Sequence, residues 1–125
     1  FDSGCSEKAA RQYGGDRFML THTEMDQYWS NYLRAPEDAA NPFACPALAK
    51  LEGLPPAFLA IAECDVLAEQ NQVMAARMAA AGVEVNAVVY PGATHSFLEA
   101  VSISELAGRA LQESSLWLKA KTAPR

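Results

Sequence analysis

Two short apolar runs, joined by a stretch with helical character, dominate the hydrophobic pattern of this chain. Residues 58–62 (FLAIA) and 85–90 (VNAVVY) are mostly apolar, as expected of strands that are covered on both faces. Residues 69–81 between them are rich in Ala, Met, Gln and Arg, which favour helix, and Gly82 suits the position after a helix C-terminus. Two parallel strands need a crossover of this kind, so the pattern predicts a right-handed βαβ unit.

Polar caps mark two helices before this unit. Ser6 is placed to cap a short helix over residues 6–13, which Gly14 and Gly15 end. Residues 21–24 (THTE) form a capping-box pattern that begins a second helix, and Pro36 is expected to end it. The second helix carries a stripe of apolar residues, which we interpret as core packing, with lining of an acyl or alcohol pocket as the alternative: Met25, Tyr28, Trp29, Tyr32 and Leu33.

A last helix is predicted after the βαβ unit. Residues 102–105 (SISE) form a further capping-box pattern, and the helix is expected to run to the region of Lys119. Residues 122–125 are expected to fray. The buried face of this helix is expected to consist of Leu106, Ala110, Leu111, Trp117 and Leu118.

Composition and charge describe a globular chain and disfavour several partners. Half of the 125 residues are hydrophobic and a fifth are charged, which fits one domain of ordinary size. The formal net charge of −5 disfavours nucleic acid and acidic membranes, because both attract basic patches. Cys5, Cys45 and Cys64 are too widely spaced for a zinc pattern and cannot all pair, so the cytoplasm is the expected location. No apolar run approaches the length of a membrane span.

Asp65 and His95 are the candidate catalytic residues. Asp65 lies three residues after the first apolar run, and His95 lies five residues after the second. Because parallel strands end on the same side of a sheet, we expect the two side chains to converge there. We predict that a carboxylate oxygen of Asp65 lies within about 2.6–3.2 Å of Nδ1 of His95. A carboxylate that orients a histidine is the acid–base half of a nucleophilic triad, and the nucleophile is the missing part.

Three other reactive side chains fit structural roles better. Ser6 lies in the sequence GCSEK, where Lys8 replaces the second Gly of a Gly-x-Ser-x-Gly nucleophile elbow, so we interpret it as a helix cap. Cys64 has an acidic neighbour, which disfavours an activated thiolate, and it suits a small buried position at a strand end. His22 lies within the capping box and is expected at the surface.

Three stretches in this order resemble the C-terminal half of the hormone-sensitive-lipase-like α/β-hydrolases, the esterase and lipase family with an HGGG motif. They are residues 54–67 (LPPAFLAIAECDVL), 79–84 (AAAGVE) and 90–97 (YPGATHSF). The part from the aromatic helix through residues 41–46 (NPFACP) is similar to the segment that follows the sixth strand of that family. The resemblance implies an α/β fold: residues 1–125 form a single partial α/β-hydrolase domain, with two parallel strands in a βαβ unit and flanking helices.

By this resemblance, Asp65 matches the acid and His95 the base of a Ser-His-Asp triad in a carboxylic-ester hydrolase that acts on acyl esters. The sequence contains neither the HGGG motif nor the nucleophile elbow, which belong to the N-terminal half of the family. The chain alone is therefore expected to be inactive. No cofactor and no metal are implied. Ser96 stands where the family usually carries Gly, and its side chain is expected to crowd the loop or alter its turn.

An alternative is a non-catalytic fragment that persists by association. The chain lacks an initiator Met and opens on Phe1, so we expect it to begin inside a longer sequence. Two strands do not make a stable sheet alone, and the 58–62 strand is expected to have an unpaired edge where the earlier strands of the family would lie. Either the missing half is present as another chain, or copies of this chain associate.

Overall fold

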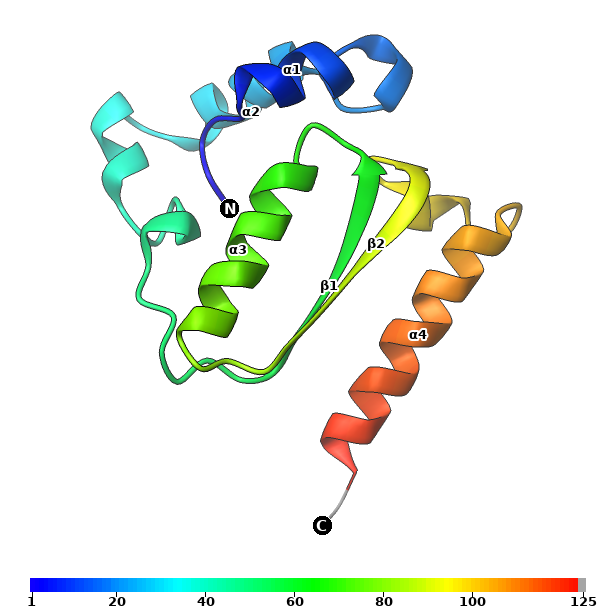
Figure 1. Ribbon diagram of the computed structural model, residues 1–125. Coiled ribbons are helices and arrows are strands. Elements are labelled where there is room, and N and C mark those ends of the chain that lie inside the picture. The colour runs from blue at the N-terminus through cyan, green and yellow to red at the C-terminus, as the bar shows by residue number, and fades with distance from the viewer. Residues whose placement is uncertain (124–125) are drawn as a thin grey trace.

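The two predicted strands form a parallel pair in the computed structural model, which describes residues 1–123 (Figure 1). Strand β1 (Ala57–Cys64) lies beside β2 (Val85–Thr94), with Ala57 opposite Val85. Helix α3 (Ala68–Ala80) connects them, and Gly82 follows it with φ +81°, as expected of the residue after a helix C-terminus. The predicted βαβ unit is confirmed, and both strands continue beyond their predicted carboxyl ends.

The sheet is covered by one helix on each face, so that residues alternate between two apolar layers along the strands (Figure 1). On one face, Leu59 and Ile61 of β1 pack with Ala68 and Ala75 of α3. The other face packs against helix α4 (Glu105–Thr122), where the buried cluster consists of Ala62, Tyr90, Ala93 and Ala110. Cover on both faces accounts for the apolar residues in both strands, although Ala60, Ala87 and Val89 remain exposed in the described chain.

The N-terminal helices form a third layer above the end of the sheet where the strands finish (Figure 1). They are α1 (Glu7–Tyr13) and α2 (His22–Tyr32), which begin at Ser6 and Thr21 as predicted. The Ser6 hydroxyl accepts the amide of Ala9 at 3.1 Å, and Thr21 and Glu24 form the complete capping box. Ala9, Leu20 and Met25 of this layer pack on Val66, in the loop after β1.

Short 3₁₀ helices join these elements. Pro36 begins one of them and does not end α2, which finishes at Tyr32 because the chain turns extended at Leu33. The 3₁₀ helices are Asp16–Phe18, Pro36–Ala40, Pro46–Leu48 and Phe97–Ala100. Within residues 1–123, none of the helices combines the length and the apolar character needed to cross a membrane.

The apolar stripe of α2 is only partly buried, with Trp29 and Leu33 at intermediate exposure, which corrects its interpretation as core. Of its five members only Met25 is buried, whereas Tyr28 and Tyr32 are 60% and 64% exposed. The physical reason is the position of α2 at the rim of the molecule, where it touches the rest of the described chain through the end that carries Met25. The apolar spacing therefore identified the helix correctly and its environment incorrectly.

Helix α4 also differs from its prediction. Its N-cap is Ser104, which accepts the amide of Ala107 at 3.3 Å, and not Ser102. The fully buried residues of α4 are Ala107 and Ala110, while Leu111 and Leu118 are exposed. Ala110 packs with Ala62, Tyr90 and Ala93 of the sheet, and Leu106 packs against the same cluster. Of the residues expected to fray, Thr122 is helical, and Pro124 and Arg125 lie outside the described residues.

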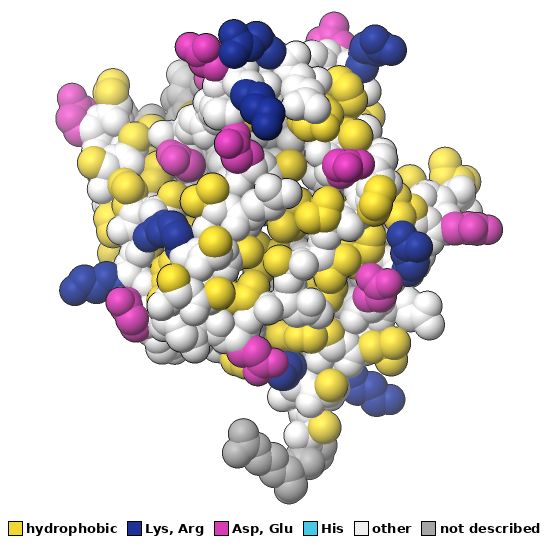
Figure 2. All heavy atoms as spheres, viewed as in Figure 1, with side chains coloured by type: hydrophobic (Ala, Val, Ile, Leu, Met, Phe, Trp, Pro, Cys, Tyr) yellow, Lys and Arg dark blue, Asp and Glu magenta, His cyan; other side chains and the backbone are white. Residues whose placement is uncertain are grey.

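One edge of β1 has no strand partner in the described chain, as expected. Hydrophobic side chains gather between α3 and α4 in Figure 2, in the region where Figure 1 shows the sheet. Phe58 of β1 and Trp117 of α4 contribute a ring pair here, with centroids 5.7 Å apart, and both remain partly exposed. An unpaired edge flanked by apolar side chains is a surface that favours further strand pairing.

Tyr90 of β2 links the sheet to α4 by a hydrogen bond. Its side chain is fully buried at 1% exposure, and its hydroxyl donates a hydrogen bond of 2.7 Å to Glu113 of α4. Burial, together with the neighbouring Glu113 carboxylate, raises the pKa of Tyr90 from 10 to about 12.

We expect Tyr90→Phe to lower the free energy of unfolding by about 1–1.5 kcal/mol, because the variant loses this hydrogen bond. In the wild type, the unfolded chain releases the tyrosine proton near pH 10 and the folded chain only near pH 12. The stabilisation is therefore complete below pH 10 and is lost as the pH rises towards 12. Urea unfolding of both proteins between pH 8 and pH 11 gives the free energy of unfolding at each pH. If this free energy falls equally with pH in the wild type and in Tyr90→Phe, the assignment is contradicted.

Candidate active site

Asp65 is fixed by the turn between β1 and α3. Its side chain is 8% exposed, and Oδ1 accepts the amide of Leu67 at 2.8 Å. The Asp65 carbonyl accepts the amide of Ala68, which completes the turn at the start of α3. One carboxylate oxygen is thus held by the backbone, and Oδ2 is left to face the loop after β2.

His95 meets Asp65 at the carboxyl ends of the strands. Nδ1 of His95 lies 2.9 Å from Oδ2 of Asp65, so the predicted contact is confirmed in position and in length. The imidazole is 34% exposed, whereas the carboxylate is almost fully buried. Because Nδ1 faces Asp65, Nε2 lies on the opposite side of the ring. The arrangement gives a histidine that a carboxylate orients and whose second nitrogen is directed away from that carboxylate.

An irregularity in the strand pairing brings the two residues together. Ala62 pairs with Tyr90, but the next pair is Cys64 with Thr94. Three residues of β2, numbers 91–93, therefore lie opposite the single residue Glu63 of β1. After the bulge, the residues that follow the last pair are Asp65 and His95. His95 lies farther from the end of its apolar run than Asp65 does, and the extra residues of β2 in the bulge account for this difference.

The first turn of α2 lies close to His95. Hydrogen bonds from the Thr21 backbone and hydroxyl hold the pKa of the Glu24 carboxyl below its usual value, and His95 lowers this pKa further when its imidazole is protonated. Glu24 accepts the Thr21 amide at 2.9 Å as part of the capping box. The capping box thus also places a second carboxylate in the electrostatic surroundings of the histidine.

Ser96 adopts the left-handed conformation, with φ +57° and ψ +18°. Such angles suit glycine, since a Cβ is unfavourable there by about 1–2 kcal/mol. The Ser96 side chain is exposed, and the contact between His95 and Asp65 is formed with serine in place.

We expect Ser96→Gly to raise the free energy of unfolding by about 0.5–1 kcal/mol, because it removes Cβ from a left-handed residue. Ser96→Ala keeps Cβ and is the matched control, with a stability within about 0.5 kcal/mol of the wild type. Urea unfolding followed by circular dichroism compares the three proteins. Equal stability of the Gly and Ala variants would show that the backbone is not strained here.

The other reactive side chains lie in structural roles. Ser6 caps α1 and also donates a hydrogen bond to Glu69 at the start of α3. His22 is exposed, as predicted, with Nδ1 3.5 Å from Asp26. Cys64 is partly buried at the end of β1. Within residues 1–123, no three side chains of His, Cys, Asp or Glu gather in a way that would hold a metal ion.

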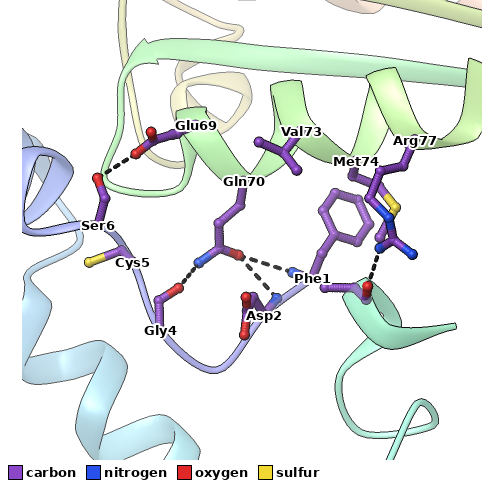
Figure 3. Close-up of a pocket in the computed structure, with 11 residues that line it drawn as sticks. Phe1, Asp2, Gly4, Cys5, Ser6, Glu69, Gln70, Val73, Met74 and Arg77 are labelled. Carbon is purple, nitrogen blue, oxygen red and sulfur yellow. Dashed lines mark hydrogen bonds between the residues drawn. The ribbon is translucent and has the colours of Figure 1, made fainter.

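A separate pocket of about 360 Å³ lies between the N-terminal segment and α3 (Figure 3). Its polar contacts tie the segment to the helix: Gln70 accepts the amide of Asp2 at 3.1 Å and donates to the carbonyl of Gly4. Arg77 donates to the carbonyls of Ala47 and Ala49. Neither Asp65 nor His95 lines this pocket. Its side chains hold the N-terminal layer in place.

Glu63, which lies at the site, was not predicted from the sequence. Glu63 accepts the amide of Gly92 at 2.8 Å and so joins β1 to the bulged part of β2. A carboxylate near the end of an otherwise apolar strand, two residues before Asp65, is the signal that could have identified it.

Comparisons with known proteins agree with this geometry. A family model described as the alpha/beta hydrolase fold matches residues 2–99. An ethyl acetate hydrolase of Pseudomonas putida is 32% identical over 111 residues, which cover 88% of this chain and 35% of that enzyme. This chain therefore spans about a third of the length of that relative.

Two solved esterases have the same fold over nearly the whole chain. A thermostable esterase of Pseudomonas putida superposes with a TM-score of 0.91 at 29% identity, over 99% of this chain and 40% of that one. The hyperthermophilic esterase of the archaeon Pyrobaculum calidifontis gives a TM-score of 0.89 at 30% identity, over 95% of this chain and 39% of that one. This chain belongs to the α/β-hydrolase family and groups within it with the hormone-sensitive-lipase-like esterases, as its sequence motifs implied.

Proposed function

We propose that this chain supplies the acid and the base of a Ser-His-Asp triad in a carboxylic-ester hydrolase. The observation that supports the proposal best is the 2.9 Å contact between Nδ1 of His95 and Oδ2 of Asp65. The esterase relatives supply the reaction class. We treat residues 1–125 as a single partial α/β-hydrolase domain, to which a serine and the donors of an oxyanion hole are added from outside these residues.

In the proposed mechanism, Nε2 of His95 removes the proton of that serine as its oxygen attacks the ester carbonyl. The same nitrogen then protonates the departing alcohol. Asp65 holds the imidazole in the tautomer with the proton on Nδ1 and stabilises the imidazolium that forms. The backbone bond from Leu67 to Oδ1 keeps the carboxylate in this orientation. By analogy with the ethyl acetate hydrolase, we propose short acyl esters as substrates.

A chimera tests these roles. Residues 1–125 replace the matching segment of the Pseudomonas putida ethyl acetate hydrolase, and hydrolysis of p-nitrophenyl acetate is measured. We expect Asp65→Asn to lower kcat by about 10⁴-fold, because the imidazole then takes the wrong tautomer. His22→Gln is the matched control, since His22 also lies beside an aspartate but on the surface, and its kcat should equal that of the parent chimera. Full activity of the Asp65→Asn chimera would exclude the proposed role of Asp65.

The 125-residue chain alone provides a second test. We expect no turnover of p-nitrophenyl acetate beyond that of free imidazole, because the sequence contains no Gly-x-Ser-x-Gly. Turnover that a fluorophosphonate abolishes would mean that a serine of this chain is the nucleophile.

We also propose that the chain associates, either with a chain that carries the missing half or with further copies of itself. The free edge of β1 and the exposed side chains of Val89, Leu111 and Leu118 favour this. Native mass spectrometry of the purified chain measures the state. We expect an assembly larger than 13.5 kDa, and a stably folded monomer would contradict the proposal.

A further inference from the structure

In the bulge that precedes His95, the backbone amide of Gly92 is bonded to a side chain. Gly92 lies among the three residues of β2 that face the single residue Glu63, and its φ of +73° turns the backbone out of the regular ladder. A backbone donor in such a position needs another acceptor. The acceptor is the Glu63 carboxylate, whose Oε2 lies 2.8 Å from the Gly92 nitrogen.

This bond joins the two strands just before the residues of the candidate pair. Glu63 lies on β1 two positions before Asp65, and Gly92 lies on β2 three positions before His95. Thr94 regains its pairing with Cys64 only after the bulge, so the path of residues 91–93 fixes where His95 begins. A bond across the bulge therefore couples the conformation of the histidine loop to the strand that carries the aspartate.

We propose that Glu63 is a positioning residue for the His95–Asp65 pair. It acts through the hydrogen bond from the Gly92 amide, which holds the bulged end of β2 in the register that keeps Nδ1 of His95 beside Oδ2 of Asp65. A charge-assisted bond of this kind is stronger than a neutral one. The importance of this geometry for ester hydrolysis rests on the proposed function, whereas the positioning itself does not.

Variants at position 63 separate the effect of side-chain length from the effect of charge. Glu63→Gln retains an acceptor oxygen at the same distance from the backbone, whereas Glu63→Asp retains the charge but is one methylene too short to reach Gly92. Glu63→Ala removes both the charge and the acceptor. Glu52→Ala, at an exposed glutamate in the turn before β1, is the matched control.

The readout is the Nδ1 proton of His95, observed by nitrogen-15 NMR of the 125-residue chain in its native assembly. A His22→Gln background leaves His95 as the sole histidine, which assigns the signal. We expect the proton to exchange with water about tenfold faster in the Ala and Asp variants, the factor that corresponds to one charged hydrogen bond. Because Gln keeps a neutral acceptor, that variant should exchange only about threefold faster than the background, and the Glu52→Ala variant should exchange within about twofold of it. Circular dichroism verifies that each variant is folded.

Unchanged exchange in both the Ala and the Asp variants would overturn the proposal, and so would equal acceleration in the Gln and Asp variants. If Glu63→Ala fails to fold, the comparison of Gln with Asp decides. The measurement requires no catalysis, so a failure of the ester-hydrolysis proposal in the chimera would leave its result intact.

Discussion

The hydrogen-bonded ladder between β1 and β2 is the interaction on which the remainder of the structure depends. Because the ladder is parallel, it requires α3 as a crossover and leaves the opposite face to α4. The same geometry places the loops after both strands at one end of the sheet, where Asp65 and His95 meet. The N-terminal helices then cover this end through the contact of their apolar side chains with Val66.

Much of this could be predicted from sequence because the signals are local. Ser6 and the capping box at Thr21 satisfy amides within their own helices, so their effect does not depend on distant residues. The apolar runs of both strands indicate cover on two faces, and Asp65 and His95 follow from the direction of parallel strands alone. These features need only the chain order and elementary backbone geometry.

The features that were missed depend on tertiary contacts. Residues 91–93 include Pro and Gly, which disfavour strand, so the continuation of β2 is visible only when Glu63 is seen to accept the Gly92 amide. The spacing of Tyr28 and Tyr32 indicates a helix with an apolar face but does not say whether another element covers that face. In α4, the fully buried residues are Ala107 and Ala110, while Leu111 and Leu118 are exposed, and a period of apolar residues does not say which of them will face the sheet.

The N-terminal layer is attached to the sheet differently from α3 and α4. Its ties to α3 are largely polar and solvent-exposed, through Gln70 and Glu69, and its apolar contact is a small cluster around Val66. Units with few buried apolar contacts open at a lower free energy than the core. This layer should therefore separate as a cooperative unit while β1 and β2 remain paired. Each opening admits water to the surroundings of Val66 and Asp65, so the low-dielectric environment of the carboxylate is intermittent.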